Sequence, residues 1–220
     1  MSLVIFDMDG TLIDTQALIA EHMAATFAGV GLVAPTPAQS RRVIGLSLPV
    51  AMGRLAESDD AALIDRLVAD YRVHYKAALL TENGREGLFP GARAALERLR
   101  AEPGVELGIA TGKGLSGVHR ILALHDIADF FVTLQTPDHN PSKPHPGMVF
   151  RAMEETGAVP AETVMIGDTT FDIEMGKAAG AKAIGVAWGY HEPEELVAAG
   201  ADIVIERFDQ LDAAIKTVLE

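Results

Sequence analysis

A short apolar run that ends abruptly at two aspartates constrains the fold of this chain most. Residues 3–6 (LVIF) are followed by Asp7, Met8, Asp9 and Gly10. An apolar, β-rich run that stops at acid and glycine predicts a buried strand ending in a turn. Because side chains alternate along an extended backbone, Asp7 and Asp9 point to the same side. Open α/β sheets bind ligands just beyond the carboxyl ends of their strands, so this pair predicts a functional site there.

The chain from residue 87 onward alternates between apolar runs of strand length and helical patterns. We predict strands at residues 105–110, 130–134, 163–166, 182–187 and 202–205. The predicted helices are at residues 90–100, 115–124, 146–156, 171–179, 193–199 and 208–218. Strands that alternate with helices of this length predict an α/β fold, in which a parallel sheet is covered by helices on both faces.

Residues 15–85, which separate the first predicted strand from the others, show helical patterns and no strand pattern. Asp14 is a start signal for the first helix, and Thr36 forms a capping box with Gln39 at the start of a second, predicted to run to Ile44. A compact sheet rarely accommodates so long a segment as a loop, so we predict an inserted helical domain. The predicted domains are an α/β core at residues 1–14 and 86–220 and a helical domain at residues 15–85.

Charge and composition exclude several classes of partner. The chain has 18 Lys and Arg residues against 31 Asp and Glu residues, a formal net charge of −13. Nucleic acids and anionic membranes require a basic surface, so we expect neither as a partner. There is no cysteine, hence no disulfide and no thiolate metal site, and we expect a cytoplasmic location. We also expect no signal peptide and no membrane span, and either a monomer or a homodimer.

Two segments later in the chain carry groups suited to binding a phosphoryl oxygen. Thr111 and Gly112 follow a predicted strand, and offer a hydroxyl and a backbone amide. A plain turn is the alternative interpretation of this pair. Lys143 lies between prolines in residues 141–147 (PSKPHPG), so its loop is stiff and its ammonium group can neutralise Asp7 and a bound phosphate.

Asp168 ends another predicted strand, and Asp172 follows one helical turn later. All strand carboxyl ends lie on one edge of a parallel sheet, so these carboxylates can meet Asp7 and Asp9. Several carboxylates held close together favour a hard cation with oxygen ligands, such as Mg²⁺. Stabilisation of a helix start by its dipole is the alternative explanation for Asp172.

Four motifs in the expected order resemble those of a known family. Residues 7–14 (DMDGTLID) resemble the first motif of the haloacid dehalogenase superfamily, in its phosphatase branch. Thr111 matches the second motif, residues 142–147 (SKPHPG) resemble the third, and residues 166–172 (IGDTTFD) resemble the fourth. The resemblance covers nearly the whole chain. It implies a Rossmann-like core and a type I helical cap at the position of the insert.

The resemblance also implies a mechanism and a cofactor. It implies a phosphatase that hydrolyses a small phosphorylated metabolite through an aspartyl-phosphate intermediate, with Mg²⁺ as cofactor. Asp7 would be the nucleophile and Asp9 the general acid and base. The implied catalytic residues are Asp7, Asp9, Thr111 and Lys143. The implied metal-site residues are Asp7, Asp9 through its backbone carbonyl, Asp168, and Asp172 in support.

The helical insert is expected to carry substrate specificity. Residues 41–46 (RRVIGL) resemble the cap segment of phosphoglycolate phosphatases, near the distal end of the substrate. The implied substrate-binding residues are Thr111, Gly112, Lys143, Arg42 and Gly45. A solvated helix face is the alternative for Arg42. The substrate class predicted is a phosphoglycolate-like ester or a sugar phosphate.

Two rival functions remain open at this point. The first is a β-phosphoglucomutase, an isomerase with the same core, although such mutases have a histidine about one turn after Thr15, where this chain has Ile19. The second is a non-catalytic binding protein, because a fold does not determine a function. The four complete motifs favour an enzyme over the second.

Overall fold

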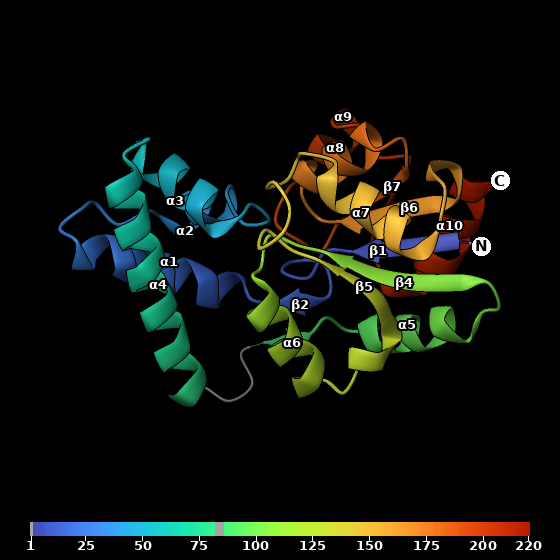
Figure 1. Cartoon of the computed structure of the whole chain (residues 1–220), viewed down its shortest axis with the longest axis horizontal. Coiled ribbons are helices and arrows are strands. Elements are labelled where there is room, and N and C mark those ends of the chain that lie inside the picture. Colours follow the sequence, from blue (N-terminus) through green and yellow to red (C-terminus); the bar gives the residue numbers. More distant parts are fainter. Residues whose placement is uncertain (1, 82–85) are drawn as a thin grey trace.

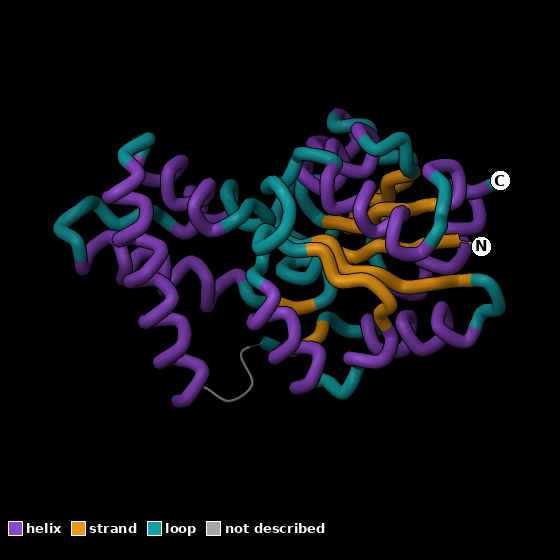
Figure 2. The backbone as a smooth tube through the Cα atoms, in the orientation of Figure 1, coloured by secondary structure: helices purple, strands orange, loops and turns teal. Residues whose placement is uncertain are grey.

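A computed structural model describes residues 2–81 and 86–220. Its centre is a six-stranded sheet in the order β5-β4-β1-β6-β7-β8, in which all neighbouring strands are parallel (Figures 1 and 2). The strands are β1 (Ser2–Phe6), β4 (Val105–Ala110), β5 (Phe131–Gln135), β6 (Thr163–Gly167), β7 (Lys182–Val186) and β8 (Ile203–Ile205). Their bounds after β1 differ from the predicted ones by at most one residue at either end. The predicted Rossmann-like α/β sheet is therefore confirmed.

Helices cover both faces of this sheet, as its continuous apolar strands require. Val4 and Phe6 of β1 belong to the hydrophobic cluster on the face with α5, α6 and α10, while Leu3 and Ile5 belong to the cluster on the face with α7 and α8. This is the alternation expected of a strand buried on both sides. The helices of the core are α5 (Ala92–Ala101), α6 (Leu115–Leu124), α7 (Gly147–Thr156), α8 (Thr170–Ala178), α9 (Pro193–Ala198) and α10 (Leu211–Leu219). Single 3-10 turns lie at Ala128–Phe130, Pro160–Glu162 and Phe208–Gln210.

The described part of the inserted segment forms four helices that lie beyond the carboxyl ends of the strands (Figure 1). They are α1 (Gln16–Gly29), α2 (Pro37–Arg41), α3 (Leu48–Ala56) and α4 (Ala61–Thr81). Buried side chains such as Phe27, Met52 and Leu67 form a separate hydrophobic cluster, which also takes in Phe171 and Tyr190 from the core. The insert therefore packs on the core through apolar contacts. Among the described helices, none is long and apolar enough to cross a membrane.

The connections between core and insert differ from the prediction. Asp14 does not cap α1: it lies in a two-residue strand, β2 (Ile13–Asp14), which pairs antiparallel with β3 (Gly87–Leu88), and Thr15 is the N-cap. Strands this short have no periodic pattern, so the sequence does not predict them. The boundary between residues 85 and 86 lies at the edge of the described residues, and the division into two domains stays a prediction.

The second helix of the insert is shorter than predicted. The capping box of Thr36 and Gln39 is present: the backbone amide of Gln39 donates to Thr36 Oγ1, and the backbone amide of Thr36 donates to Gln39 Oε1. The helix nevertheless ends at Arg41, and turns continue to Gly45, whose φ is 99°. A positive φ at this position favours glycine, because a Cβ would be strained there. These turns carry the insert towards the strand ends.

Candidate active site

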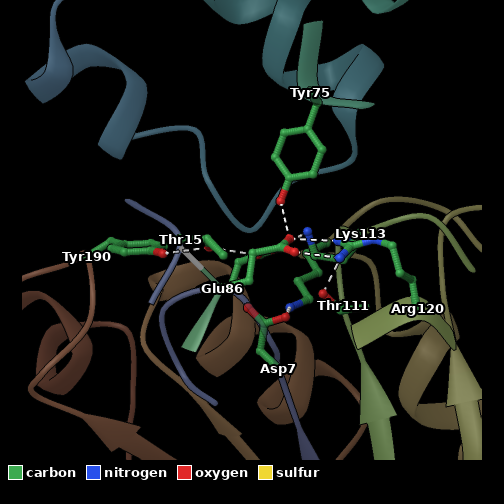
Figure 3. Close-up of polar contacts among 10 residues, drawn as sticks. Asp7, Thr15, Tyr75, Glu86, Thr111, Lys113, Arg120 and Tyr190 are labelled. Atoms are coloured by element: carbon green, nitrogen blue, oxygen red, sulfur yellow. Dashed lines mark hydrogen bonds and ion pairs between the residues drawn. The ribbon is translucent and has the colours of Figure 1, made fainter. Parts of the chain in front are cut away.

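The carboxyl ends of three adjacent strands bring the predicted residues together. β1 lies between β4 and β6, so Asp7, Thr111 and Asp168 follow neighbouring strands. The Asp7 amide donates to the Ile166 carbonyl at 2.9 Å, and the Thr111 amide donates to the Gln135 carbonyl at 3.1 Å. These bonds continue the sheet ladder by one residue and fix the direction of both side chains. Figure 3 shows Asp7 below Thr111, at the end of its strand.

Lys143 is the central cation of the site. Its Nζ lies 2.9 Å from Asp7 Oδ1 and 2.5 Å from Asp172 Oδ1, and all three side chains are buried. Burial lowers the pKa of Lys143, but the Asp172 and Asp7 carboxylates raise it, and the net shift is upward. The ammonium group therefore stays charged and holds the carboxylates in place.

Asp172 joins the site to the start of α8. Its Oδ2 accepts hydrogen bonds from the Thr169 amide at 3.1 Å and the Thr169 hydroxyl at 2.6 Å, which complete a capping box. Its other oxygen receives the Lys143 ammonium. Oδ2 of Asp172 thus caps the start of α8, and Oδ1 orients the Lys143 ammonium. The capping bonds support a helix-start role for Asp172, and its part in a metal site stays a prediction.

Asp168 is held from two directions and is fully buried. Its Oδ1 accepts from the Thr11 hydroxyl at 2.8 Å, and its Oδ2 accepts from the Tyr190 amide at 2.9 Å. A Cβ on Gly10 or on Gly189 would collide with this carboxylate, so both backbones pass close to it. Burial, then the Asp172 and Asp7 charges, raise the pKa of Asp168 well above its ordinary value, against the two hydrogen bonds.

The three carboxylates of Asp7, Asp168 and Asp172 fit a divalent cation. Each offers an oxygen, and these oxygens lie within 4.8 Å of one another. Within the described part of the chain, Asp7 Oδ1 is paired with the Lys143 ammonium, and Asp7 Oδ2 has no hydrogen-bond partner. Burial raises the pKa of Asp7 to about 7, opposed by Lys143 and assisted by Asp172 and Asp9. Such an unfavourable set of buried charges, all oxygen donors, suits a hard cation such as Mg²⁺.

The Asp9 carboxylate lies outside this cluster and faces a different set of groups. Its Oδ1 accepts from the Thr15 hydroxyl at 2.6 Å, and the Nζ of Lys113 lies 3.1 Å from its Oδ2. The Asp7 and Asp9 carboxylates thus contact different groups, although the two residues are only two positions apart in the sequence. The sequence alone did not predict Lys113 as a site residue. Its position two residues after Thr111, at the end of a strand, is the feature that could have indicated it.

A cavity of about 700 Å³ lies between the insert and the strand ends. Asp9, Thr111, Gly112 and Lys113 line it from the core. A Cβ on Gly112 would lie 2.5 Å from the Gly45 carbonyl oxygen, so the backbones of insert and core touch at the cavity wall. The insert contributes mostly apolar side chains to the lining, among them Ile19, Met23, Val43, Ile44 and Leu48.

Comparison with known proteins decides the family. The family model of haloacid dehalogenase-like hydrolases matches residues 4–186. This chain belongs to that family. The chain is 33% identical to "Probable phosphatase IndB" of Dickeya dadantii (strain 3937), over 99% of this chain and 95% of that protein. It is 32% identical to the phosphoglycolate phosphatase of Yersinia pseudotuberculosis serotype I (strain IP32953), over 96% of this chain and 92% of that protein.

The fold of a solved structure agrees with this membership. A hydrolase from Pseudomonas syringae superposes with a TM-score of 0.86 at 25% identity, covering 98% of this chain and 99% of that one. The prediction of a phosphatase of the haloacid dehalogenase-like family is therefore confirmed at the level of enzyme class.

Arg42 of this haloacid dehalogenase-like hydrolase lies away from the cavity, unlike Gly45. It is not among the lining residues, and its guanidinium donates to Glu195 Oε2 at 2.8 Å on the exposed surface. The hydrogen bond from Arg42 lowers the pKa of Glu195 to about 2. The arrangement favours the solvated-face interpretation of Arg42 over substrate binding in this conformation.

A second buried network joins the insert to the core of the hydrolase. Glu86 is 4% exposed and accepts from the Tyr75 hydroxyl of α4 at 2.5 Å. Arg120 of α6 donates to both Glu86 oxygens, at 2.5 and 2.7 Å (Figure 3). Tyr75 and Arg120 both line the cavity. No sequence motif marked this network, because its three members lie on separate elements.

Proposed function

We propose that the protein is a Mg²⁺-dependent phosphatase that hydrolyses a small phosphate monoester through an aspartyl phosphate on Asp7. One observation carries the proposal: the fully buried Asp7 carboxylate lies against the Lys143 ammonium, which is 2.9 Å from Oδ1, while Oδ2 has no hydrogen-bond partner among the described residues. A carboxylate desolvated in this way, and held by one cation, is prepared to act as a nucleophile.

In the first step, an Asp7 oxygen attacks phosphorus in line and the bond from phosphorus to the alcohol oxygen breaks. Asp9 gives its proton to the departing alkoxide, so the alcohol leaves neutral. The position of Asp9 in the cavity wall supports this role, since its carboxylate borders the space where the alcohol portion would lie. The phosphoryl group is then a mixed anhydride on Asp7.

In the second step, Asp9 takes a proton from a water molecule and the water oxygen attacks phosphorus. The bond between phosphorus and the Asp7 oxygen breaks, which releases inorganic phosphate and restores the Asp7 carboxylate and the protonated form of Asp9. Splitting the reaction in this way explains why two carboxylates are needed in separate surroundings.

Charge on the transferring group is balanced by groups around Asp7. Lys143 would offset part of that charge, and the Thr111 hydroxyl and Gly112 amide, from residues that line the cavity, would donate to phosphoryl oxygens. Asp7, Asp168 and the backbone carbonyl of Asp9 would hold Mg²⁺, with Asp172 in support through Lys143. When bound, the cation would polarise the phosphoryl oxygens as a Lewis acid.

The residues that line the cavity are suited to a small ester whose alcohol portion is anionic or polar. Lys113 supplies a positive charge next to Asp9. The name of the phosphoglycolate phosphatase relative indicates that its substrate is a small phosphate ester with an anionic alcohol portion. Sugar phosphates fit the same volume. Ile19 lies in the cavity wall where a mutase would have its histidine, which favours hydrolysis over isomerisation.

The test is phosphate release from a panel of phosphoglycolate, sugar phosphates and nucleotides, with Mg²⁺ or with EDTA. We expect Mg²⁺-dependent release from at least one ester, lost in Asp7→Asn and retained in Asp59→Asn, a control on the exposed surface of the insert. Full activity in Asp7→Asn would overturn the proposal. Conversion of β-glucose 1-phosphate to an isomer without phosphate release would instead identify a mutase, and binding without turnover would identify a binding protein.

A further inference from the structure

Tyr190 lies in the loop after β7 and reaches the Asp9 carboxylate through one intermediate residue. Its side chain is 3% exposed, and its hydroxyl lies 3.2 Å from Thr15 Oγ1. Thr15 in turn donates its hydroxyl proton to Asp9 Oδ1 at 2.6 Å. A hydroxyl has a single proton, so Thr15 must accept from Tyr190 while it donates to Asp9. The three groups form a directed chain from the phenol to the carboxylate. Figure 3 shows its first two members, Tyr190 and Thr15.

The Thr15 hydroxyl is at an N-cap position but takes part in this hydrogen-bonded chain instead of capping α1. Thr15 is the N-cap of α1, where a threonine side chain normally accepts from an amide in the first helical turn. In the described part of the chain its side chain makes no such capping bond. Loss of a cap costs helix stability. The hydroxyl is therefore directed at Asp9 at the expense of the helix.

The same tyrosine also touches a second carboxylate of the site. Its backbone amide donates to Asp168 Oδ2 at 2.9 Å. A Cβ on Gly10 would lie 2.7 Å from the Tyr190 ring, so the turn between Asp7 and Thr11 is shaped to admit this ring. The ring packs in the hydrophobic cluster of the insert, which fixes the direction of its hydroxyl. One residue thus connects Asp168, through its amide, with Asp9, through its hydroxyl.

We propose that Tyr190 is a positioning residue that holds the Asp9 carboxylate, through Thr15, in the orientation needed to protonate the leaving alcohol. This inference rests on the proposed function and adds a residue that the four motifs do not contain. The Tyr190 hydroxyl orients the Thr15 hydroxyl, and the Thr15 hydroxyl fixes Asp9 Oδ1. The other oxygen, Oδ2, faces Lys113 and the cavity.

The test compares two kinds of leaving group. An alkoxide needs a proton from Asp9 as it departs, whereas p-nitrophenolate is stable without one. The value of kcat/KM reports the steps up to loss of the alcohol, so it isolates this difference from the later hydrolysis of the aspartyl phosphate. In Tyr190→Phe, which keeps the ring, we expect kcat/KM to fall about 3- to 10-fold for the best alkyl phosphate. For p-nitrophenyl phosphate, we expect a change of less than about twofold.

A second variant removes the intermediate hydroxyl. Thr15→Val should show the same selectivity with a larger loss for the alkyl ester, about 10- to 100-fold, because the lost bond is to a charged group. Thr26→Val is the matched control: Thr26 is a buried threonine of the same helix whose hydroxyl donates to the His22 carbonyl, and both esters should be unaffected. The double variant should be no worse than Thr15→Val, because both changes break one chain.

The outcomes separate this inference from the function on which it rests. An equal loss for both esters, or no loss for either, in Tyr190→Phe with an unchanged melting temperature would overturn the positioning role. Additive losses in the double variant would also overturn it. If Asp7→Asn is inactive in each of these cases, the phosphatase mechanism stands without Tyr190. If Asp7→Asn stays active, the mechanism itself fails.

Discussion

The ammonium group of Lys143 lies 2.5 Å from Asp172 Oδ1, and both side chains are fully buried. Lys143 also contacts Asp7 at 2.9 Å, so one positive charge serves a cluster of three buried carboxylates. Removal of one partner from a buried charge network leaves the others uncompensated, which costs about 3–5 kcal/mol. The same lysine therefore contributes to stability as well as to the proposed chemistry.

We expect Lys143→Met to lower the free energy of unfolding by about 3–5 kcal/mol in EDTA, because the carboxylates lose their counter-charge. Denaturant unfolding followed by circular dichroism measures this. Lys177→Met is the control, since Lys177 forms an ion pair with Asp202 on the surface and should change stability by less than about 1 kcal/mol. Equal effects of the two substitutions would contradict this account of Lys143.

Divalent cation should stabilise the protein independently of any substrate. Binding to the folded state alone adds about 2.7 kcal/mol when the free ion is at 100 times its dissociation constant. We expect Mg²⁺ to raise the melting temperature of the wild type. Asp168→Asn should lose this rise while it still unfolds cooperatively, as differential scanning calorimetry can measure. A Mg²⁺-dependent rise of the same size in Asp168→Asn would place the cation elsewhere.

The sequence predicts the core fold well because its signals are local and periodic. The strands are short, mostly apolar runs, and parallel pairing of β1, β4 and β6 then places Asp7, Thr111 and Asp168 on one edge without further information. Lys143 carried a strong local signal as well, because prolines flank it. These are the residues whose positions follow from strand ends and loop stiffness alone.

The residues that sequence reasoning missed depend on tertiary contacts. Lys113, Glu86 and Tyr190 belong to three different segments, and each meets its partner only when parts of the chain that are distant in sequence fold together. Uncharged groups such as the Tyr190 hydroxyl give no signal in composition or charge. Arg42 is the opposite case. Its charge and its segment indicated a substrate-binding residue, but in the structure it pairs with Glu195 at the surface.

Lys113 should influence binding of the alcohol portion more than binding of the phosphate. Its Nζ lies 3.1 Å from Asp9 Oδ2 at the cavity wall, and 5.3 Å from the centre of the Tyr75 ring. We expect Lys113→Met to raise KM for phosphoglycolate about 10-fold, because a hydrogen bond to a charged group is worth about 1.5–3 kcal/mol. A neutral alcohol phosphate of similar size should be affected less. Steady-state kinetics on both esters, beside Lys177→Met, measures this, and equal changes would exclude a charge-specific role.

Gly112 tests whether the close contact between insert and core matters for turnover. A Cβ at this position would lie 2.5 Å from the Gly45 carbonyl oxygen, and backbone cannot yield as a flexible side chain can. We expect Gly112→Ala to push the insert away and to reduce kcat/KM about 10-fold or more, since closure excludes water from such sites. Gly29→Ala is the control, because its Cβ would meet its nearest neighbour at 4.0 Å. Unchanged kinetics in Gly112→Ala would show that catalysis does not need this contact.

Glu86 should make the attachment of the insert sensitive to acid. Burial raises the pKa of Glu86, but hydrogen bonds from Arg120 and Tyr75 lower it, and the net shift is downward from 4.5. The unfolded state then binds protons more readily than the folded state, so the stabilisation is present above the unfolded pKa and is lost as pH falls through the folded pKa.

We expect Glu86→Gln to lower the free energy of unfolding by about 1–3 kcal/mol at about pH 7. The difference from wild type should be smaller at about pH 4, because protonation of Glu86 in the unfolded state, whose pKa is 4.5, then removes part of the stabilisation. Denaturant unfolding at the two pH values, with Glu97→Gln as an exposed control, measures it. A difference that is the same at both pH values would mean that packing, and not the charge of Glu86, joins Tyr75 of the insert to Arg120 of the core.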